Sequence, residues 1–171
     1  MKITVESIRE LRDQCGAGVM DCRKALLETE GNFEKALDIL KQQGLIRAKK
    51  KAERSTSQGL VEAYIHRGGR IGAMVEVNCE TDFVARTDEF KQLSHFLAMQ
   101  IAAMNPKFIS QEEIPEDDKD IDPQVACLLL QPDIRQPDRN IQDTINETIA
   151  RLGENIRVSR FARFEIGGQR T

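Results

Sequence analysis

The chain has 171 residues, of which 40% are hydrophobic, and its 25 basic and 28 acidic residues give a net charge of -3. This composition predicts a folded protein with one domain of ordinary size and a small appendage. It argues against a protein whose main partner is nucleic acid, and the lack of a run of about 20 apolar residues argues against a membrane protein. The charged N-terminus lacks the apolar segment of a signal peptide, so we expect a cytoplasmic protein.

Cysteines and histidines are few, which bears on metal binding and catalysis. The four cysteines are far apart in the sequence and lack the C-x-x-C pairing of zinc and redox sites, and the chain has two histidines. We therefore expect free thiols, no metal site and no bound cofactor. A hydrolase that pairs Cys22 or Cys79 with His66 or His95 is a weak alternative, because neither cysteine lies in a recognised catalytic setting.

Residues 3–44 predict three short helices. Apolar residues recur at three- and four-residue spacing within each helix, and Gly16-Ala17-Gly18 and Gly31 interrupt the pattern. The first interruption follows no strand and lacks the lysine of a phosphate-binding loop, so we interpret it as a corner between two helices. Gly44 is expected to end the third helix. A bundle of this size has a small core, and we expect its surface to carry the function.

The next segment, Leu45 to Arg54, is strongly basic and favours a helix. Most such segments are solvated faces or linkers, and this one has no interleaved aromatic residues that could stack on bases. We therefore expect a connector helix without direct nucleic-acid binding. It completes an N-terminal domain of residues 1–54, and Ser55-Thr56-Ser57 marks the boundary to a second domain of residues 55–171.

Two alternating segments around Gly68-Gly69 predict a β-hairpin at the start of the second domain. A helix that begins near Thr87 and ends before Pro106 is expected to cover the apolar face of this hairpin. That face is expected to carry Val61, Ala63, Ile65, Ile71, Ala73, Val75 and Val77. The opposite face would remain open, with Tyr64, Met74, Glu76 and Phe161.

The C-terminal part of the chain completes the predicted fold. Residues 110–139 are acidic and punctuated by prolines, so we expect an irregular connection anchored by the apolar residues 125–130. A helix capped by Asn140 and a third strand follow. The strand is expected to place one side toward the core, with Ile156, Val158, Ala162, Phe164 and Ile166. The fold class is therefore α+β, a three-stranded antiparallel sheet covered by helices on one face.

A short connection between the second strand and its covering helix carries the most distinctive side chains. Thr81-Asp82-Phe83-Val84 places an acid beside a large aromatic residue. A loop that is held at both ends by rigid elements can present such side chains to a partner. The alternative is that Phe83 folds back into the core, as single aromatic residues often do.

Three blocks of the sequence, LRDQCGAGVMDCRKAL, VEVNCETDFVAR and GENIRVSRFARFEIG, resemble elongation factor Ts in their order and positions. That family comprises guanine-nucleotide exchange factors of the GTPase elongation factor Tu. The resemblance implies an N-terminal domain like a ubiquitin-associated module, an α+β core, and a protein that is no enzyme. The chain departs from the family in having one core where many relatives have two, in Asp133 where Phe is common, and in Gln100 where His is common.

The resemblance also implies the residues that contact elongation factor Tu. Asp82 and Phe83 are expected to insert beside the magnesium and phosphate region and to promote GDP release. The N-terminal domain is expected to bind the GTP-binding domain elsewhere, and three further residues, Ile71, Gly72 and Gln100, match those offered by the second core of tandem relatives. Because one core carries both sets, a homodimer is expected. The full set is Arg12, Val19, Met20, Ile71, Gly72, Thr81, Asp82, Phe83, Val84 and Gln100.

A second hypothesis assigns the chain to another functional class. The helical bundle would be an adaptor, like a ubiquitin-associated module, that captures peptides or an RNA-bound partner. The core would then be a passive dimerisation unit. Binding to such ligands without an effect on GDP release would favour this hypothesis.

Overall fold

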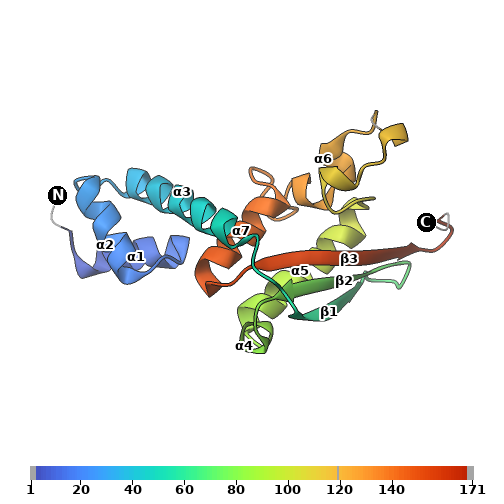
Figure 1. Ribbon diagram of the computed structural model, residues 1–171, viewed down its shortest axis with the longest axis horizontal. Helices are drawn as coiled ribbons and strands as arrows, with labels where there is room; N and C mark the ends of the chain where they lie inside the picture. Colours follow the sequence, from blue (N-terminus) through green and yellow to red (C-terminus); the bar gives the residue numbers. More distant parts are fainter. Residues whose placement is uncertain (1–2, 119, 169–171) are drawn as a thin grey trace. The chain divides into compact units, whose positions relative to one another are not determined.

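The computed structural model describes residues 3–118 and 120–168 (Figure 1). It divides into two compact units. The first comprises Met1–Arg54 together with Asn146–Asn155, and the second comprises Ser55–Ile145 together with Ile156–Thr171. The sequence predicted a boundary after Arg54, but it did not predict that Asn146–Asn155 would group with the N-terminal residues.

The first unit contains α1 (Val5–Cys15), α2 (Val19–Glu28) and α3 (Phe33–Lys51). Thr4 and Ser7 form a capping box at the start of α1, and Gly16 ends this helix with a left-handed backbone, φ 66°. The glycine corner is therefore a turn between helices, as expected. The core of this bundle is small and consists of Leu11, Cys22, Ala25, Leu26, Ala36 and Leu40.

The third helix is longer than predicted, because it continues through Gly44 to Lys51. A helix-interior glycine is tolerated at a cost of about 1 kcal/mol. At Gly44 a Cβ would lie 3.4 Å from the Cβ of Ala150, which belongs to α7 (Ile141–Leu152). The lack of a side chain thus permits close packing. The ammonium group of Lys51 donates a 2.6 Å hydrogen bond to the carbonyl of Gly153, which ties the same segments together.

The second unit is built on an antiparallel sheet in the order β1 (Gln58–Ile65), β2 (Ile71–Cys79) and β3 (Ile156–Glu165). Helix α5 (Asp88–Met104) packs against one face of this sheet (Figure 1). The buried residues of β2 and α5 form the core, and they include Ala73, Val75, Val77, Cys79, Phe90, Leu93, Leu97 and Ile101. The prediction of an α+β fold with helices on one face of the sheet is confirmed.

The prediction was wrong about which face of β1 lies toward α5. Directly paired residues of an antiparallel ladder share a face. Glu62 pairs with buried Val75 and Tyr64 with buried Ala73, so these polar side chains point toward the helix. Val61, Ala63 and Ile65 point the other way, and Val61 and Ile65 are 58% and 66% exposed, whereas Leu60 pairs with buried Val77 on the covered face. Alternation identified two faces, but the register decided which of them is covered.

A β-bulge corrects the prediction for β3. Val158 pairs with Val77 and Arg160 pairs with Glu76, so Ser159 is an extra residue in the ladder. One inserted residue reverses the faces of all residues beyond it. Ile156 and Val158 are buried as expected, whereas Ala162 and Phe164 lie on the open face and Phe161 lies on the covered face.

The connection between α5 and α7, which the sequence predicted to be irregular, contains short helical elements. These are η1 (Gln111–Glu113), η2 (Glu116–Asp118), α6 (Pro123–Ala126) and η3 (Leu128–Leu130). Buried Ala126, Cys127 and Leu128 anchor the connection to the unit. Within the residues that the structure describes, no helix is long and apolar enough to cross a membrane.

Candidate partner-binding site

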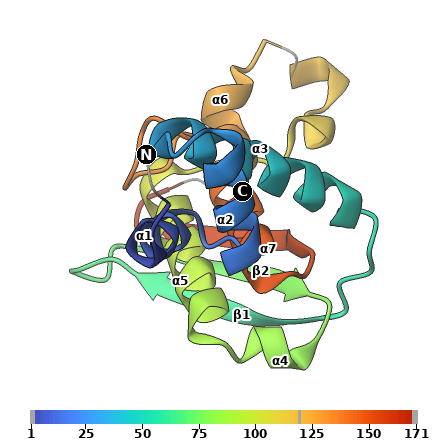
Figure 2. The same cartoon turned by 90° about the vertical axis from the view of Figure 1, so that its left-hand side faces the viewer.

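The connection after β2 folds into one helical turn, α4 (Asp82–Ala85), between β2 and α5 (Figure 2). The hydroxyl of Thr81 caps this turn by accepting a hydrogen bond from the amide of Val84, at 3.4 Å. At the other end, the Thr87 hydroxyl donates to the carbonyl of Val84, at 2.8 Å, and accepts from the amide of Phe90, at 3.2 Å. Two threonine caps therefore hold the turn in place.

Phe83 projects from this turn into solvent. Its exposed fraction is 78%, whereas that of its neighbour Val84 is 9%. The turn therefore anchors itself in the core through Val84 and leaves the aromatic ring outside. The alternative interpretation, in which Phe83 packs into the core, is wrong. An exposed phenyl group on a fixed turn is suited to insertion into a pocket of another protein.

Asp82 has a partner on the same turn that sequence reasoning missed. Its carboxylate lies 2.8 Å from the guanidinium of Arg86. Both side chains are largely accessible, with 47% of Asp82 and 78% of Arg86 exposed. The four-residue spacing of an acid and a base in a helix was the signal that could have identified the pair. The carboxylate beside Phe83 therefore has a positively charged partner on its own turn.

Ile71 and Gly72 lie at the other end of β2 from Asp82 and Phe83. A strand rises about 3.3 Å per residue, so the two sets are roughly 30 Å apart along β2. Gly72 belongs to the open face of the sheet, where a Cβ would lie 2.7 Å from the Cδ1 of Ile65. The structure does not bring the two predicted sets together within one copy of the chain.

Gln100 is completely buried, which does not fit the predicted contact with a partner. Its amide nitrogen donates to the carbonyl of Pro132 at 3.1 Å and to the side chain of Gln131 at 3.4 Å. Its amide oxygen accepts from the backbone amide of Ile134, also at 3.1 Å. Gln100 therefore fastens the segment after η3 to α5, a structural role that uses its polar atoms inside the protein.

Asp133, another departure from the family pattern, is also buried within a polar network. Its carboxylate accepts hydrogen bonds from the hydroxyl of Thr144, at 2.8 Å, and from the backbone amide of Arg135, at 2.7 Å. Burial by itself would raise the pKa of Asp133, but these hydrogen bonds and the charge of Arg135 outweigh it and hold the pKa below its ordinary value. The network fixes the connection that leads into α7.

The predicted residues of the N-terminal bundle flank the corner between α1 and α2. Arg12 is exposed on the last turn of α1. Val19 and Met20 begin α2, and their exposed fractions are 52% and 68%. All three side chains are accessible, as a binding surface requires.

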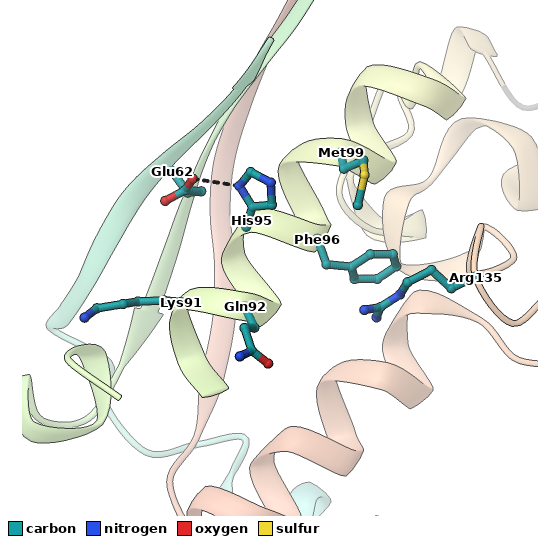
Figure 3. A pocket seen from close by; sticks show the side chains of 7 residues that line it. All are labelled: Glu62, Lys91, Gln92, His95, Phe96, Met99 and Arg135. Atoms are coloured by element: carbon teal, nitrogen blue, oxygen red, sulfur yellow. Dashed lines mark hydrogen bonds and ion pairs between the residues drawn. The ribbon is translucent and has the colours of Figure 1, made fainter. Parts of the chain in front are cut away.

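A shallow cavity of about 430 Å³ lies beside α5 (Figure 3). On one side of the cavity, His95 forms a 2.9 Å ion pair or hydrogen bond with Glu62 of β1. On the other side, the guanidinium of Arg135 stacks 3.4 Å above the ring of Phe96. The residues that line it are Glu62, Lys91, Gln92, His95, Phe96, Met99 and Arg135, and this lining contains no Ser, Thr or Cys side chain. Among the described residues, no group of three or more His, Cys, Asp or Glu side chains could hold a metal ion.

Comparison with known proteins points to one family. The family model described as Elongation factor TS matches residues 39–127. The chain is 48% identical to elongation factor Ts of Syntrophomonas wolfei over 194 aligned positions, which cover 96% of this chain and 91% of that protein. It is 44% identical to elongation factor Ts of Thermotoga neapolitana, with 98% of each chain covered. Both alignments are longer than 171 residues, so these relatives contain residues that have no counterpart here.

Proposed function

Since this chain belongs to the elongation factor Ts family and is a translation elongation factor, we propose that it binds elongation factor Tu and promotes the release of GDP. The observation that carries the proposal is the exposure of Phe83, 78%, on a turn capped at both ends. A large aromatic side chain in this position is ready to enter a pocket of the partner with little loss of conformational freedom. Such a partner of the translation machinery would be met in the cytoplasm.

Exchange of a nucleotide requires no covalent step, so the protein needs no catalytic acid, base or nucleophile. An exchange factor binds the nucleotide-free GTPase better than the GDP-bound form, and by linkage it weakens GDP binding by the same factor. Each 1.4 kcal/mol of this coupling that reaches the dissociation barrier accelerates release about tenfold. The insertion of Phe83 would provide coupling of this kind if the pocket of the partner that receives the ring is open only when GDP binding is weakened.

Asp82 supports the same step through its charge. We propose that its carboxylate enters the region of the partner that holds Mg²⁺ and the phosphates of GDP. A negative charge there repels the phosphates and competes for the metal ion. The ion pair with Arg86 is exposed, so it can open when the turn docks.

The N-terminal bundle is proposed to hold the same GTPase at a second place. Arg12, Val19 and Met20 offer a cation and two apolar side chains around one helix corner. Two contact sites on one partner increase the affinity more than either does alone. Thr81 and Val84, which were also predicted to bind the partner, serve the site by holding the turn that presents Phe83.

We further propose that the working form is a homodimer that forms through the open face of the sheet. Ladder pairs place Ile65, Gly72 and Phe164 side by side, and Ala63, Met74 and Ala162 beside them. Four large apolar side chains of this face are between 48% and 69% exposed, namely Val61, Ile65, Met74 and Phe164. An apolar surface of this kind is suited to an isologous contact with a second copy. In such a dimer, one copy could contact the partner through Ile71 and Gly72 at one end of β2, and the other copy through Asp82 and Phe83 at the opposite end.

Release of labelled GDP from elongation factor Tu tests the proposed function. Addition of this protein is expected to accelerate release at substoichiometric concentration, because each molecule acts repeatedly. Phe83→Ala should remove most of the acceleration. Binding to elongation factor Tu without faster release would contradict the proposal and favour the adaptor hypothesis.

A further inference from the structure

Two cysteines of the N-terminal bundle lie in direct contact. The sulfur atoms of Cys15 and Cys22 are 4.0 Å apart, although seven residues separate them in the sequence. Cys15 is the last residue of α1 and Cys22 lies in the first turns of α2, and the corner at Gly16, with φ 66°, brings the two helix ends together. The sequence analysis did not predict this contact, and no disulfide joins the four cysteines in the structure.

The two thiols differ in their access to solvent. Cys22 is completely buried in the bundle core, where its thiol points toward the carbonyl of Ala17 at 3.7 Å. Cys15 packs against this core but remains partly exposed. A small oxidant can therefore reach the sulfur atom of Cys15. The sulfur atom of Cys22 lies behind it, in van der Waals contact. An accessible cysteine next to a second, resolving cysteine is the arrangement of many redox-sensing sites.

We propose that Cys15 and Cys22 are a redox modification site, at which a peroxide produces an intramolecular disulfide that closes the corner between α1 and α2. The S–S bond is about 2.05 Å long, so the sulfur atoms must approach by about 2 Å. Rotation of the two side chains with a small shift of the helix ends can supply this approach. Reversible disulfides of this type are the ones that occur in reducing compartments.

The reaction balances in two steps. The thiolate of Cys15 attacks one oxygen of the peroxide, the O–O bond breaks, and Cys15 becomes a sulfenic acid while hydroxide leaves. The sulfur of Cys22 then attacks the sulfur of Cys15, the S–O bond breaks, and water leaves with the proton of Cys22. In total, two thiols lose two electrons and two protons, and one hydrogen peroxide becomes two waters. A dithiol reductant reverses the modification.

The environment of Cys22 supports this order of events. Burial, together with the neighbouring Cys15, raises the pKa of Cys22 to about 12, so this thiol stays protonated and does not compete for the oxidant.

The consequence for activity rests on the proposed function. Arg12 lies three residues before Cys15, and Val19 and Met20 lie just before Cys22. A disulfide would pull the start of α2 toward the end of α1 and move these side chains relative to one another. We expect the oxidised protein to need a several-fold higher concentration for half-maximal GDP release, with recovery after reduction.

Tryptic mass spectrometry of the full chain tests the modification directly. Cleavage after Arg12 and Arg23 releases one peptide, residues 13–23, that contains both cysteines. After treatment with hydrogen peroxide and an alkylating agent, this peptide should carry no alkyl group and weigh about 2 Da less than the dithiol form. Cys79 and Cys127, both buried, should remain available for alkylation after unfolding. Dithiothreitol should restore two alkylation sites in the peptide.

Three cysteine replacements test whether the loss of mass depends on Cys15 and Cys22. Cys15→Ser and Cys22→Ala should each abolish the loss of mass, and Cys127→Ser should retain it. A disulfide between two chains through Cys15, or overoxidation of Cys15 beside an untouched Cys22, would overturn the proposal. If the disulfide forms but leaves GDP release unchanged, its regulatory consequence is wrong. If the reduced protein fails to release GDP, the proposed function fails, while the mass measurement still tests the disulfide.

Discussion

The carboxylate of Asp82 and the guanidinium of Arg86 form an ion pair of 2.8 Å across the turn α4. The pair lies beside the exposed ring of Phe83, so a charged group and an apolar group are presented from the same turn. Exposed ion pairs of this kind contribute at most about 1 kcal/mol. The pair can therefore orient Asp82 in the free protein and still separate at little cost when the turn meets a partner.

The replacement Phe83→Ala should lower stimulated GDP release strongly and leave the fold intact. Loss of an aromatic anchor from an interface typically costs about 2 to 4 kcal/mol, which corresponds to a decrease of about 30-fold to 1000-fold in rate or affinity. The melting temperature should change little, because the ring is 78% exposed. Val84→Ala, at the buried neighbour, should instead lower the melting temperature. A folded Phe83→Ala protein with normal exchange activity would refute this role.

Asp82→Asn should reduce GDP release in the same direction as Phe83→Ala, but less. Its role is electrostatic, so the difference from the unmodified chain should shrink as the salt concentration rises. Arg86→Gln is the informative companion: it should change stability by less than about 1 kcal/mol, because the ion pair is exposed. Two results would contradict this interpretation: an Arg86→Gln protein that unfolds, or a decrease in GDP release by Asp82→Asn that does not depend on the salt concentration.

Gln100→Leu should lower the free energy of unfolding by about 1 to 3 kcal/mol, because it removes the partner of the buried Gln131 side chain and of the backbone groups of Pro132 and Ile134. Chemical denaturation measures this effect. Gln92→Leu is a suitable control, since Gln92 is an exposed glutamine on the same helix. If Gln100→Leu left stability unchanged and specifically weakened binding to elongation factor Tu, Gln100 would be a contact residue after all.

Asp133 should make the protein less stable in acid. Its pKa in the folded state lies below the ordinary value of 3.8, so the folded state binds a proton less readily than the unfolded state. The stabilisation is therefore present above about pH 4 and is lost as the pH falls through the lowered pKa. Asp133→Asn should be less stable than the unmodified chain at pH 7, and this difference should shrink toward pH 3. A constant difference across this range would exclude the carboxylate as the cause.

The homodimer should sediment with twice the mass of one chain, which is 19.4 kDa. Phe164→Lys should shift the protein toward the monomer, because it places a charge on the open sheet face, opposite Gly72 of β2. Val125→Lys is a matched control, since Val125 is a similarly exposed apolar residue, at 63% against 69%, that belongs to α6. A fully active species of 19.4 kDa would show that one copy suffices.

Local sequence determined the elements of this protein and its most exposed feature. The threonine before two acidic residues predicted where α5 begins, because a side-chain cap depends on neighbours a few residues away, whereas the short helix α4 was predicted to be a loop. Alternating and helical periods predicted the strands and helices for the same reason. The acid and the aromatic residue at Asp82 and Phe83 could be located on their connection without any knowledge of packing.

Tertiary structure decided what pairs with what. The face of β1 that is covered depends on its register with β2, and the outer half of β3 depends on the bulge at Ser159. The burial of Gln100 and the contact of Cys15 with Cys22 depend on how separate segments pack. These features arise from interactions between residues that are distant along the chain or joined by a sharp corner, and residue spacing alone carries no information about such distances.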